Sequence, residues 1–215
     1  ILFFKEHIKN LIKSLKVYKL HKPKIEKNIL KLIKLNLNKN KKYNHLLRVA
    51  VNSKIISISL RKKIKPKLNF SLNLVKYKRV QPEFKNLKYK KILNYLSKMD
   101  ASKSDIALCV NKKILESGTS NILFIKNNKI YSPINKFYKG ITYRFFEKKI
   151  GPIIKKNIFI NEINNYEEII LIGSGKGVVS ANSFLNTKWK RKSLKFYKIF
   201  LRIYKLEILK CNIYK

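Results

Sequence analysis

Apolar side chains recur at helical spacing in two segments near the start of the chain, residues 6–18 and 25–37. A spacing of three to four residues places such side chains on one face of a helix. Pro23 separates the two segments, and a proline commonly follows the end of a helix. We therefore expect two helices there. Their apolar positions are Ile8, Leu11, Ile12, Leu15 and Val17 in the first, and Ile25, Ile29, Leu30, Ile33 and Leu35 in the second.

After a polar stretch at 36–43, short apolar or alternating runs replace the helical spacing, a pattern typical of β-strands. Asn52-Ser53 and Asn127-Asn128 each lie between two such runs and favour tight turns. The expected strands are 46–51, 55–60, 69–77, 106–110, 113–116, 122–125, 129–132, 158–160 and 169–172. Further helices are expected at 87–98, 142–150 and 194–208.

This order of elements predicts an α+β fold with a mainly antiparallel sheet. A length of 215 residues suits one large domain or two small ones. Pro82 lies in a short connector, and we expect the chain to divide there. The expected parts are a small N-terminal α+β domain at 1–80, a connector at 81–84 and a larger domain at 85–215.

The charge is extreme, at +40 with 51 basic and 11 acidic residues. A cluster of basic residues would indicate a nucleic-acid binder, because such residues neutralise phosphates. Here six basic residues are arginines, the better residue for bidentate recognition, and lysines are spread along the whole chain. This distribution favours compositional drift, so no specific nucleic-acid partner is expected. Weak binding to polyanions at low salt is expected in either case.

The cysteines and the lengths of the apolar runs indicate the cellular compartment of the protein. Cys109 lies in an apolar run and Cys211 is far from it, so no disulfide framework and no metal-ligand spacing is expected. This suits a reducing compartment, and we expect a cytoplasmic protein. No apolar run approaches the roughly 18 residues that span a bilayer, so no membrane partner is expected.

Glycine is concentrated near hydroxyl side chains. Five of the six glycines lie in three short segments, at 116–121, 138–142 and 172–178. Glycine permits close approach of the backbone to a ligand, and helix N-termini bind phosphates through backbone N–H groups. These segments therefore predict a ligand that bears a phosphate.

Several segments, in their order and spacing, resemble one enzyme family over about residues 2–180. They are Pro82-Glu83-Phe84-Lys85-Asn86-Leu87-Lys88-Tyr89, Glu116-Ser117-Gly118-Thr119-Ser120-Asn121, Tyr131-Ser132-Pro133 and Gly140-Ile141-Thr142. The chain is similar here to the fold-type IV, or class IV, pyridoxal-phosphate enzymes. This family includes branched-chain and D-amino-acid aminotransferases and aminodeoxychorismate lyase.

The resemblance implies a role for each matched residue. Lys85 would carry pyridoxal 5′-phosphate covalently and move the proton at the substrate Cα, which requires an amine that can become neutral. Glu116 would accept a hydrogen bond from the protonated pyridine nitrogen of the cofactor. The remaining matched residues would contact the phosphate group and the ring of the cofactor. These are Gly140, Ile141 and Thr142 at a helix N-terminus, Gly173 and Ser174 after a strand, and Tyr89 beside the ring.

The resemblance also implies an architecture and shows departures from the family. It implies a two-domain enzyme whose small N-terminal domain is incomplete here, whose larger domain is barrel-like, and which forms a homodimer. His7 matches a family histidine, but Asn10 stands where the family has an arginine that grips the phosphate. Asn10 is uncharged and cannot make a bidentate contact.

Three functions remain open from the sequence. The leading one is transfer of an amino group between an amino acid and a 2-oxo acid, with no metal. The second is aminodeoxychorismate lyase, to which Glu116-Ser117-Gly118-Thr119-Ser120-Asn121 is slightly closer. The third is a degenerate homologue, which Asn10 would suggest, or a basic protein that binds polyanions.

Overall fold

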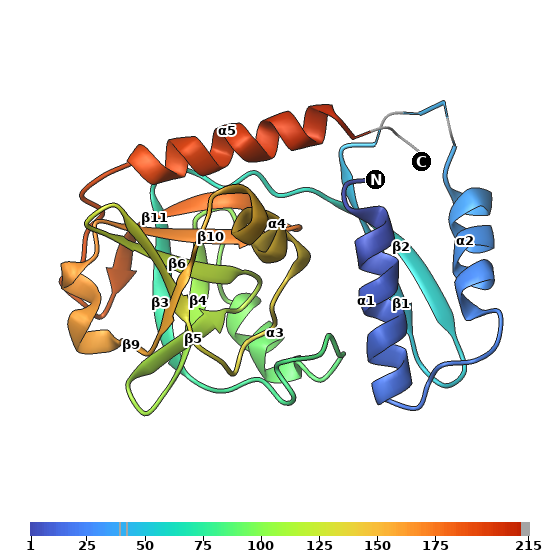
Figure 1. The fold of residues 1–215 in the computed structure, drawn as a ribbon. Helices are drawn as coiled ribbons and strands as arrows, with labels where there is room; N and C mark the ends of the chain where they lie inside the picture. Colours follow the sequence, from blue (N-terminus) through green and yellow to red (C-terminus); the bar gives the residue numbers. More distant parts are fainter. Residues whose placement is uncertain (39, 42, 212–215) are drawn as a thin grey trace. The chain divides into compact units, whose positions relative to one another are not determined.

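The computed structural model describes residues 1–38, 40–41 and 43–211 (Figure 1). The chain divides into two compact units, one of residues 1–63 with 207–215 and the other of residues 64–206. None of the helices in these residues combines the length and the apolar character that a membrane-spanning helix needs.

The first unit packs two amphipathic helices against a two-stranded antiparallel hairpin. Its elements are α1 (Phe4–Val17), α2 (Ile25–Asn36), β1 (His45–Val51) and β2 (Ile56–Lys62). The predicted turn is held by Asn52, whose Oδ1 accepts hydrogen bonds from the N–H groups of Lys54 and Ile55. Most of the apolar stripe predicted for each helix is buried or partly buried, whereas Val17 and Leu35, near the C-terminal ends of the helices, are exposed. The core residues are Ile8, Leu15, Ile25, Ile29, Ile33 and Leu37.

The second unit is built on a nine-stranded mixed sheet, in the order β8-β7-β6-β10-β11-β3-β4-β5-β9. Most neighbours are antiparallel, whereas β3 is parallel to both β4 and β11, and β7 to β8. The sheet curls so that β5 also approaches β6 and β7. The strands are β3 (Phe70–Lys76), β4 (Ser104–Val110), β5 (Lys113–Ser117), β6 (Asn121–Lys126), β7 (Lys129–Pro133), β8 (Ile154–Lys156), β9 (Ile158–Phe159), β10 (Glu168–Gly173) and β11 (Gly177–Leu185).

Helices pack on this sheet through aromatic side chains and buried caps. The elements are α3 (Lys90–Leu96), α4 (Ile141–Lys149), the 3-10 helix η1 (Ile160–Asn165) and α5 (Lys195–Leu209). Phe146 of α4 contacts Phe200 of α5, with ring centroids 4.6 Å apart. The fully buried carboxylate of Glu168 accepts hydrogen bonds from the N–H groups of Phe196 and Tyr197, and thereby caps α5.

Most predicted elements are present, and the differences have local causes. The helix expected at 87–98 begins only at Lys90, because the side chain of Asn86 holds the preceding residues in turns through bonds to Val80 O and Lys88 N. Strand β11 was not predicted. It lies between β10 and β3, and its buried positions include small and polar residues such as Ser180 and Ala181, so the sequence shows no clear apolar run there.

The compact units also begin and end at other residues than the expected domains. Residues 64–80 fall in the second unit, because β3 pairs with β4 and β11. The expected connector at 81–84 therefore lies inside that unit. Its Pro82 is buried.

Candidate functional site

The residues assigned to the cofactor from the sequence lie in the second unit, at strand ends, in the loops that follow them and in the first turn of α4, which begins with Ile141 and Thr142. Lys85 and Tyr89 lie between β3 and α3, and Glu116 is near the end of β5. Gly140 directly precedes α4. Gly173 ends β10, and Ser174 lies in the turn to β11. Separate strands thus deliver these residues, which a single local motif could not do.

A tight turn fixes Glu116 at the end of its strand. In the turn between β5 and β6, Ser117 Oγ accepts a hydrogen bond from Ser120 N at 2.7 Å. Gly118 packs so closely that a Cβ there would lie 2.7 Å from Ile106 Cγ1 and 2.9 Å from Asp105 Oδ1. A larger residue would push the turn away from β4, so glycine is required at this position.

The carboxylate of Glu116 is buried, with 3% of the residue exposed, and it has two partners. Arg79 Nε donates to Oε1 at 3.1 Å, and the Tyr138 N–H donates to Oε2 at 3.4 Å. Burial raises the pKa of Glu116 to about 7, and the charge of Arg79 opposes that rise only partly. Each carboxylate oxygen has two lone pairs, so Glu116 retains the capacity to accept a further donor.

Arg79 connects the loop that carries Lys85 to the turn that follows Glu116. Its side chain is 19% exposed, and its Nη2 donates to Gly118 O at 3.3 Å, beside the ion pair with Glu116. Sequence reasoning did not identify Arg79 as a site residue. The available signal was that arginine is rare here, at six of 51 basic residues.

The amine of Lys85 lies beside Tyr138, with Nζ 5.5 Å from the ring centroid. The surrounding protein and the charge of Arg79 lower the pKa of this amine. The residue as a whole is exposed to solvent. Both causes favour the neutral form, which is the nucleophilic form of a lysine.

The first backbone N–H groups of α4 are available to bind an anion. Gly140 has an extended conformation, and no described side chain caps the helix. The first backbone N–H groups of a helix lack intrahelical partners and attract negative charge. Thr142 Oγ1 is buried and has no hydrogen-bond partner among the described residues. A phosphate group would satisfy both the N–H groups and this hydroxyl, so these residues fit such a group.

Asn121 ties the start of α4 to the sheet. Its Nδ2 donates to Tyr138 O at 2.7 Å, and its Oδ1 accepts from the Gly140 N–H at 3.1 Å. A Cβ on Gly140 would lie 2.9 Å from this oxygen, so a side chain there would displace the amide. The sequence shows Asn121 within the segment 116–121 but indicates no role for its side chain.

The turn between β10 and β11 adjoins the turn after Glu116. A Cβ on Gly173 would lie 3.0 Å from Ser120 Oγ, and Ile172 pairs with Asn121 across the sheet. Ser174 is exposed at the start of this turn. The position is consistent with a hydroxyl that faces a ligand.

The contacts therefore join Lys85, Glu116 and Gly140 through Tyr138 and Asn121, while Gly173 packs beside Ser120. Tyr89 differs, because it packs against the apolar cluster of Val75, Ile92, Ile106 and Leu108. His7 and Asn10 lie on α1 in the first unit, where Asn10 O accepts a hydrogen bond from Ser14 Oγ.

Known proteins provide an independent comparison. Residues 1–184 match the family model described as amino-transferase class IV. A probable branched-chain-amino-acid aminotransferase of Rickettsia bellii is 26% identical over 210 residues, which cover 83% of this chain and 72% of the relative.

Solved structures share the fold at low identity. A putative 4-amino-4-deoxychorismate lyase of Legionella pneumophila has a TM-score of 0.75 at 15% identity, over 96% of this chain and 86% of that one. A branched-chain aminotransferase of Thermoproteus uzoniensis, solved with norvaline, gives 0.74 at 15% identity, over 99% and 84%. An aminotransferase of Brucella abortus bound to PLP gives 0.71 at 15% identity, over 96% and 83%. The predicted fold class is confirmed by these likenesses, and the family match extends over most of the chain: the protein belongs to the class IV aminotransferase family.

Proposed function

We propose that this protein uses pyridoxal 5′-phosphate to transfer an amino group between an amino acid and a 2-oxo acid. One observation carries the proposal. The loop of Lys85, the buried Glu116 and the uncapped start of α4 belong to one network of contacts, and Thr142 Oγ1 is left there without a partner among the described residues. The amine of Lys85 suits an aldehyde, the carboxylate of Glu116 suits a pyridine nitrogen, and the start of α4 suits a phosphate.

Glu116 is suited to a ring nitrogen. When bound, pyridoxal phosphate supplies an electron-withdrawing ring that stabilises negative charge on the substrate carbon. A carboxylate next to the nitrogen holds a proton there and keeps the ring cationic. Arg79 occupies one oxygen of Glu116 and fixes the plane of the carboxylate, so that its free lone pairs keep one direction.

Lys85 is suited to bind the cofactor and to move a proton. Its lowered pKa increases the fraction of neutral amine at a given pH, and only the neutral amine attacks a carbonyl carbon. The same nitrogen, as a free amine, would be the group that takes the proton from the substrate Cα and returns it elsewhere.

The phosphate would be held by the N–H groups of Ile141 and Thr142 and by the Thr142 hydroxyl, with Ser174 as a further donor. Asn10 replaces the expected arginine, so this grip relies on helix-terminus and hydroxyl contacts rather than on a bidentate cation. We expect a weaker affinity for the phosphate than an arginine would give.

Aminodeoxychorismate lyase is the second candidate. The residues Glu116-Ser117-Gly118-Thr119-Ser120-Asn121 favour it slightly, whereas the curated relative is a probable branched-chain aminotransferase. The first candidate predicts glutamate when amino donors are mixed with 2-oxoglutarate. The second predicts pyruvate and p-aminobenzoate from aminodeoxychorismate, so a product assay with both mixtures decides between them.

Assembly and location are proposals from the family resemblance. We propose a homodimer in the cytoplasm, acting on small amino and 2-oxo acids, without a nucleic-acid or membrane partner. Sedimentation of the full chain with and without pyridoxal phosphate tests the dimer.

The site assignment is tested by the covalent link. Pyridoxal phosphate is added to the full chain, the mixture is reduced with borohydride, and the labelled peptide is identified by mass spectrometry. We expect a visible absorption band and a label on Lys85, and we expect both to be lost in Lys85→Ala. Lys88→Ala, three residues away on an exposed side chain, is the matched control and should keep the label.

Three other outcomes would contradict the assignment or the proposed function. A label that persists in Lys85→Ala would refute the assignment of this lysine. A wild-type chain that forms no reducible bond would instead favour the degenerate homologue. Salt-dependent preference for a defined nucleic acid, without such a bond, would favour the polyanion-binding alternative.

A further inference from the structure

A buried carboxylate lies behind the candidate site and is used by none of the roles above. Asp105, at the start of β4, is fully buried. Its Oδ1 accepts a hydrogen bond from the Ile106 N–H at 2.8 Å. Its Oδ2 accepts from Thr119 Oγ1 at 2.5 Å and from Ser117 Oγ at 3.3 Å, so Asp105 holds the turn that follows Glu116.

A third partner of Oδ2 comes from the neighbouring turn. Lys176 lies between β10 and β11, two residues after Ser174, and its side chain is only 8% exposed. Its Nζ lies 3.1 Å from Asp105 Oδ2 and 3.4 Å from Ser104 O. The ammonium also lies 4.9 Å from the ring centroid of Phe70, a favourable position for a cation.

Asp105 therefore joins two turns that the strand pairing already brings together. One turn carries residues 117–120 after Glu116, and the other carries residues 174–176. Ser120 Oγ would be 3.0 Å from a Cβ on Gly173, so the turns are also in close packing contact. The ion pair between Lys176 and Asp105 therefore holds the two turns at a fixed distance from each other.

We propose that Lys176 and Asp105 are positioning residues that fix the β10–β11 turn, so that Ser174 faces the phosphate of the cofactor. The inference rests on the proposed function. Burying two charges costs hydration free energy, and an apolar pair of similar volume is often as stable. A buried pair that links two ligand-facing turns is better explained by geometry than by stability alone.

The proposal makes a selective prediction for Lys176→Met. This variant removes the ammonium but keeps most of the side-chain volume, and Asp105 still holds the turn after Glu116 through Thr119. Only the β10–β11 turn, which carries Ser174, loses its contact with Asp105. Binding should therefore weaken for a ligand with a phosphate and not for the same ligand without one.

The experiment compares pyridoxal 5′-phosphate with pyridoxal, titrated against the full chain and followed by visible absorption. For Lys176→Met we expect about tenfold weaker binding of pyridoxal 5′-phosphate, by analogy with the loss of supporting groups around other sites. Binding of pyridoxal should change by less than about twofold. Lys176→Arg keeps the charge and should restore most of the affinity.

Two control variants separate geometry from stability. Glu168→Gln removes a buried charge that caps α5, so it should lower the unfolding temperature without changing the ratio of the two affinities. Lys192→Met makes the same chemical change on an exposed lysine that contacts Asn164 O, and should change neither ligand's affinity.

A readout without cofactor accompanies the titration. In the free protein, Lys176→Met should speed hydrogen exchange at the backbone amides of residues 173–177, and exchange in β1 and β2 should stay unchanged. If Lys176→Met does not fold, the double variant Asp105→Asn with Lys176→Met leaves no unpaired buried charge and takes its place. It should show the same weaker binding of the phosphate ligand.

The following results would overturn the proposal about Lys176 and Asp105. Equal losses for both ligands, or a loss that Glu168→Gln reproduces, would reduce the pair to a stabilising contact and overturn the proposal. Unchanged affinities and exchange would overturn it as well. A wild type that binds neither ligand would refute the proposed function, and unchanged exchange at residues 173–177 would then separately refute the role of Lys176.

Discussion

At the scale of single residues, the site depends on a competition for one carboxylate. Burial of Glu116 favours the neutral acid, while Arg79 and the Tyr138 N–H favour the anion. The outcome is a pKa of about 7, so a small change in surroundings switches the charge. A cationic ring nitrogen beside Glu116 would complete the shift toward the anion.

This competition predicts how the stability of the cofactor-free protein depends on pH. The ordinary pKa of Glu116 is 4.5 and the folded value is about 7, so between these values the folded state binds more protons than the unfolded state. The contribution of Glu116 is therefore fully present below about pH 4.5 and is lost as the pH rises through about 7. The full loss is roughly 3 kcal/mol, since one pKa unit corresponds to about 1.4 kcal/mol.

Urea unfolding of the wild type and Glu116→Gln at several pH values between 5 and 8 measures this loss. Glutamine has no charge to bury, so its free energy of unfolding should fall less steeply with rising pH. The difference between the two proteins isolates Glu116 from other titrating groups, Lys85 among them. Parallel curves would contradict a raised pKa for Glu116.

The residues proposed to have a chemical role stand out in the sequence more clearly than the residues that support them. Lys85, Glu116 and Gly140 stand in motifs that a short stretch of sequence displays. Arg79 meets Glu116 from 37 residues away, and Tyr138 meets it from 22 residues away. These pairings depend on how the strands are ordered, and no local pattern of the sequence contains that order.

At the scale of elements, one amide joins a strand to a helix. Asn121 opens β6 and binds both Tyr138 O and Gly140 N, so the start of α4 takes its place from the sheet. The position of the helix N-terminus is thus set by a side chain rather than by a helix cap.

Asn121→Ala should loosen this junction. It removes two hydrogen bonds from a buried position, which should cost about 1–3 kcal/mol in the free energy of unfolding. Affinity for pyridoxal 5′-phosphate should fall as well, because the N–H groups of Ile141 and Thr142 lose their fixed direction. Urea unfolding and absorption titration measure the two effects. Asn94→Ala, on the exposed face of α3, is the control and should change neither; an unchanged affinity in Asn121→Ala would argue against this role.

Elements were predictable where apolar residues form a helical stripe or an unbroken run. The stripes of α1 and α2 follow that rule, and so do the runs of β4, β6 and β10, which are buried along nearly their whole length. The turn at Asn127-Asn128, where both residues have positive φ, was predictable from its residue types. β11 does not follow the rule, because Ser180, Asn182 and Ser183 interrupt its apolar run, and its pairing with β3 joins segments far apart in sequence.

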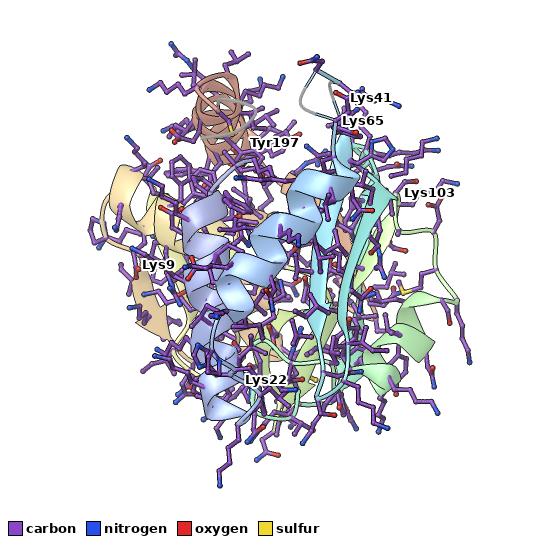
Figure 2. The ribbon with its side chains drawn as sticks, turned by 90° about the vertical axis from the view of Figure 1, so that its right-hand side faces the viewer. Lys9, Lys22, Lys41, Lys65, Lys103 and Tyr197 are labelled. Atoms are coloured by element: carbon purple, nitrogen blue, oxygen red, sulfur yellow. The ribbon has the colours of Figure 1, made fainter. Side chains whose placement is uncertain are left out.

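At the scale of the whole molecule, the positive charge lies on exposed lysine side chains. The labelled lysines Lys9, Lys22, Lys41, Lys65 and Lys103 project from the ribbon into solvent (Figure 2). Several of the few acidic side chains are instead engaged inside the protein, where Asp105, Glu116 and Glu168 are buried. The surface is therefore left with little negative charge to offset +40.

This imbalance predicts that salt stabilises the folded protein. Exposed like charges repel one another, and the Debye length falls from about 30 Å at 0.01 M salt to about 10 Å at 0.1 M. The unfolding temperature should rise between these concentrations, by roughly 2–4 °C for each kcal/mol of repulsion removed. Sodium chloride and potassium chloride should act alike, because screening depends on ionic strength. The buried pair Arg79–Glu116 is screened little, so affinity for pyridoxal should barely change over the same range. An unfolding temperature that falls with salt would mean that attractive surface pairs, rather than repulsion, dominate the charge of this protein.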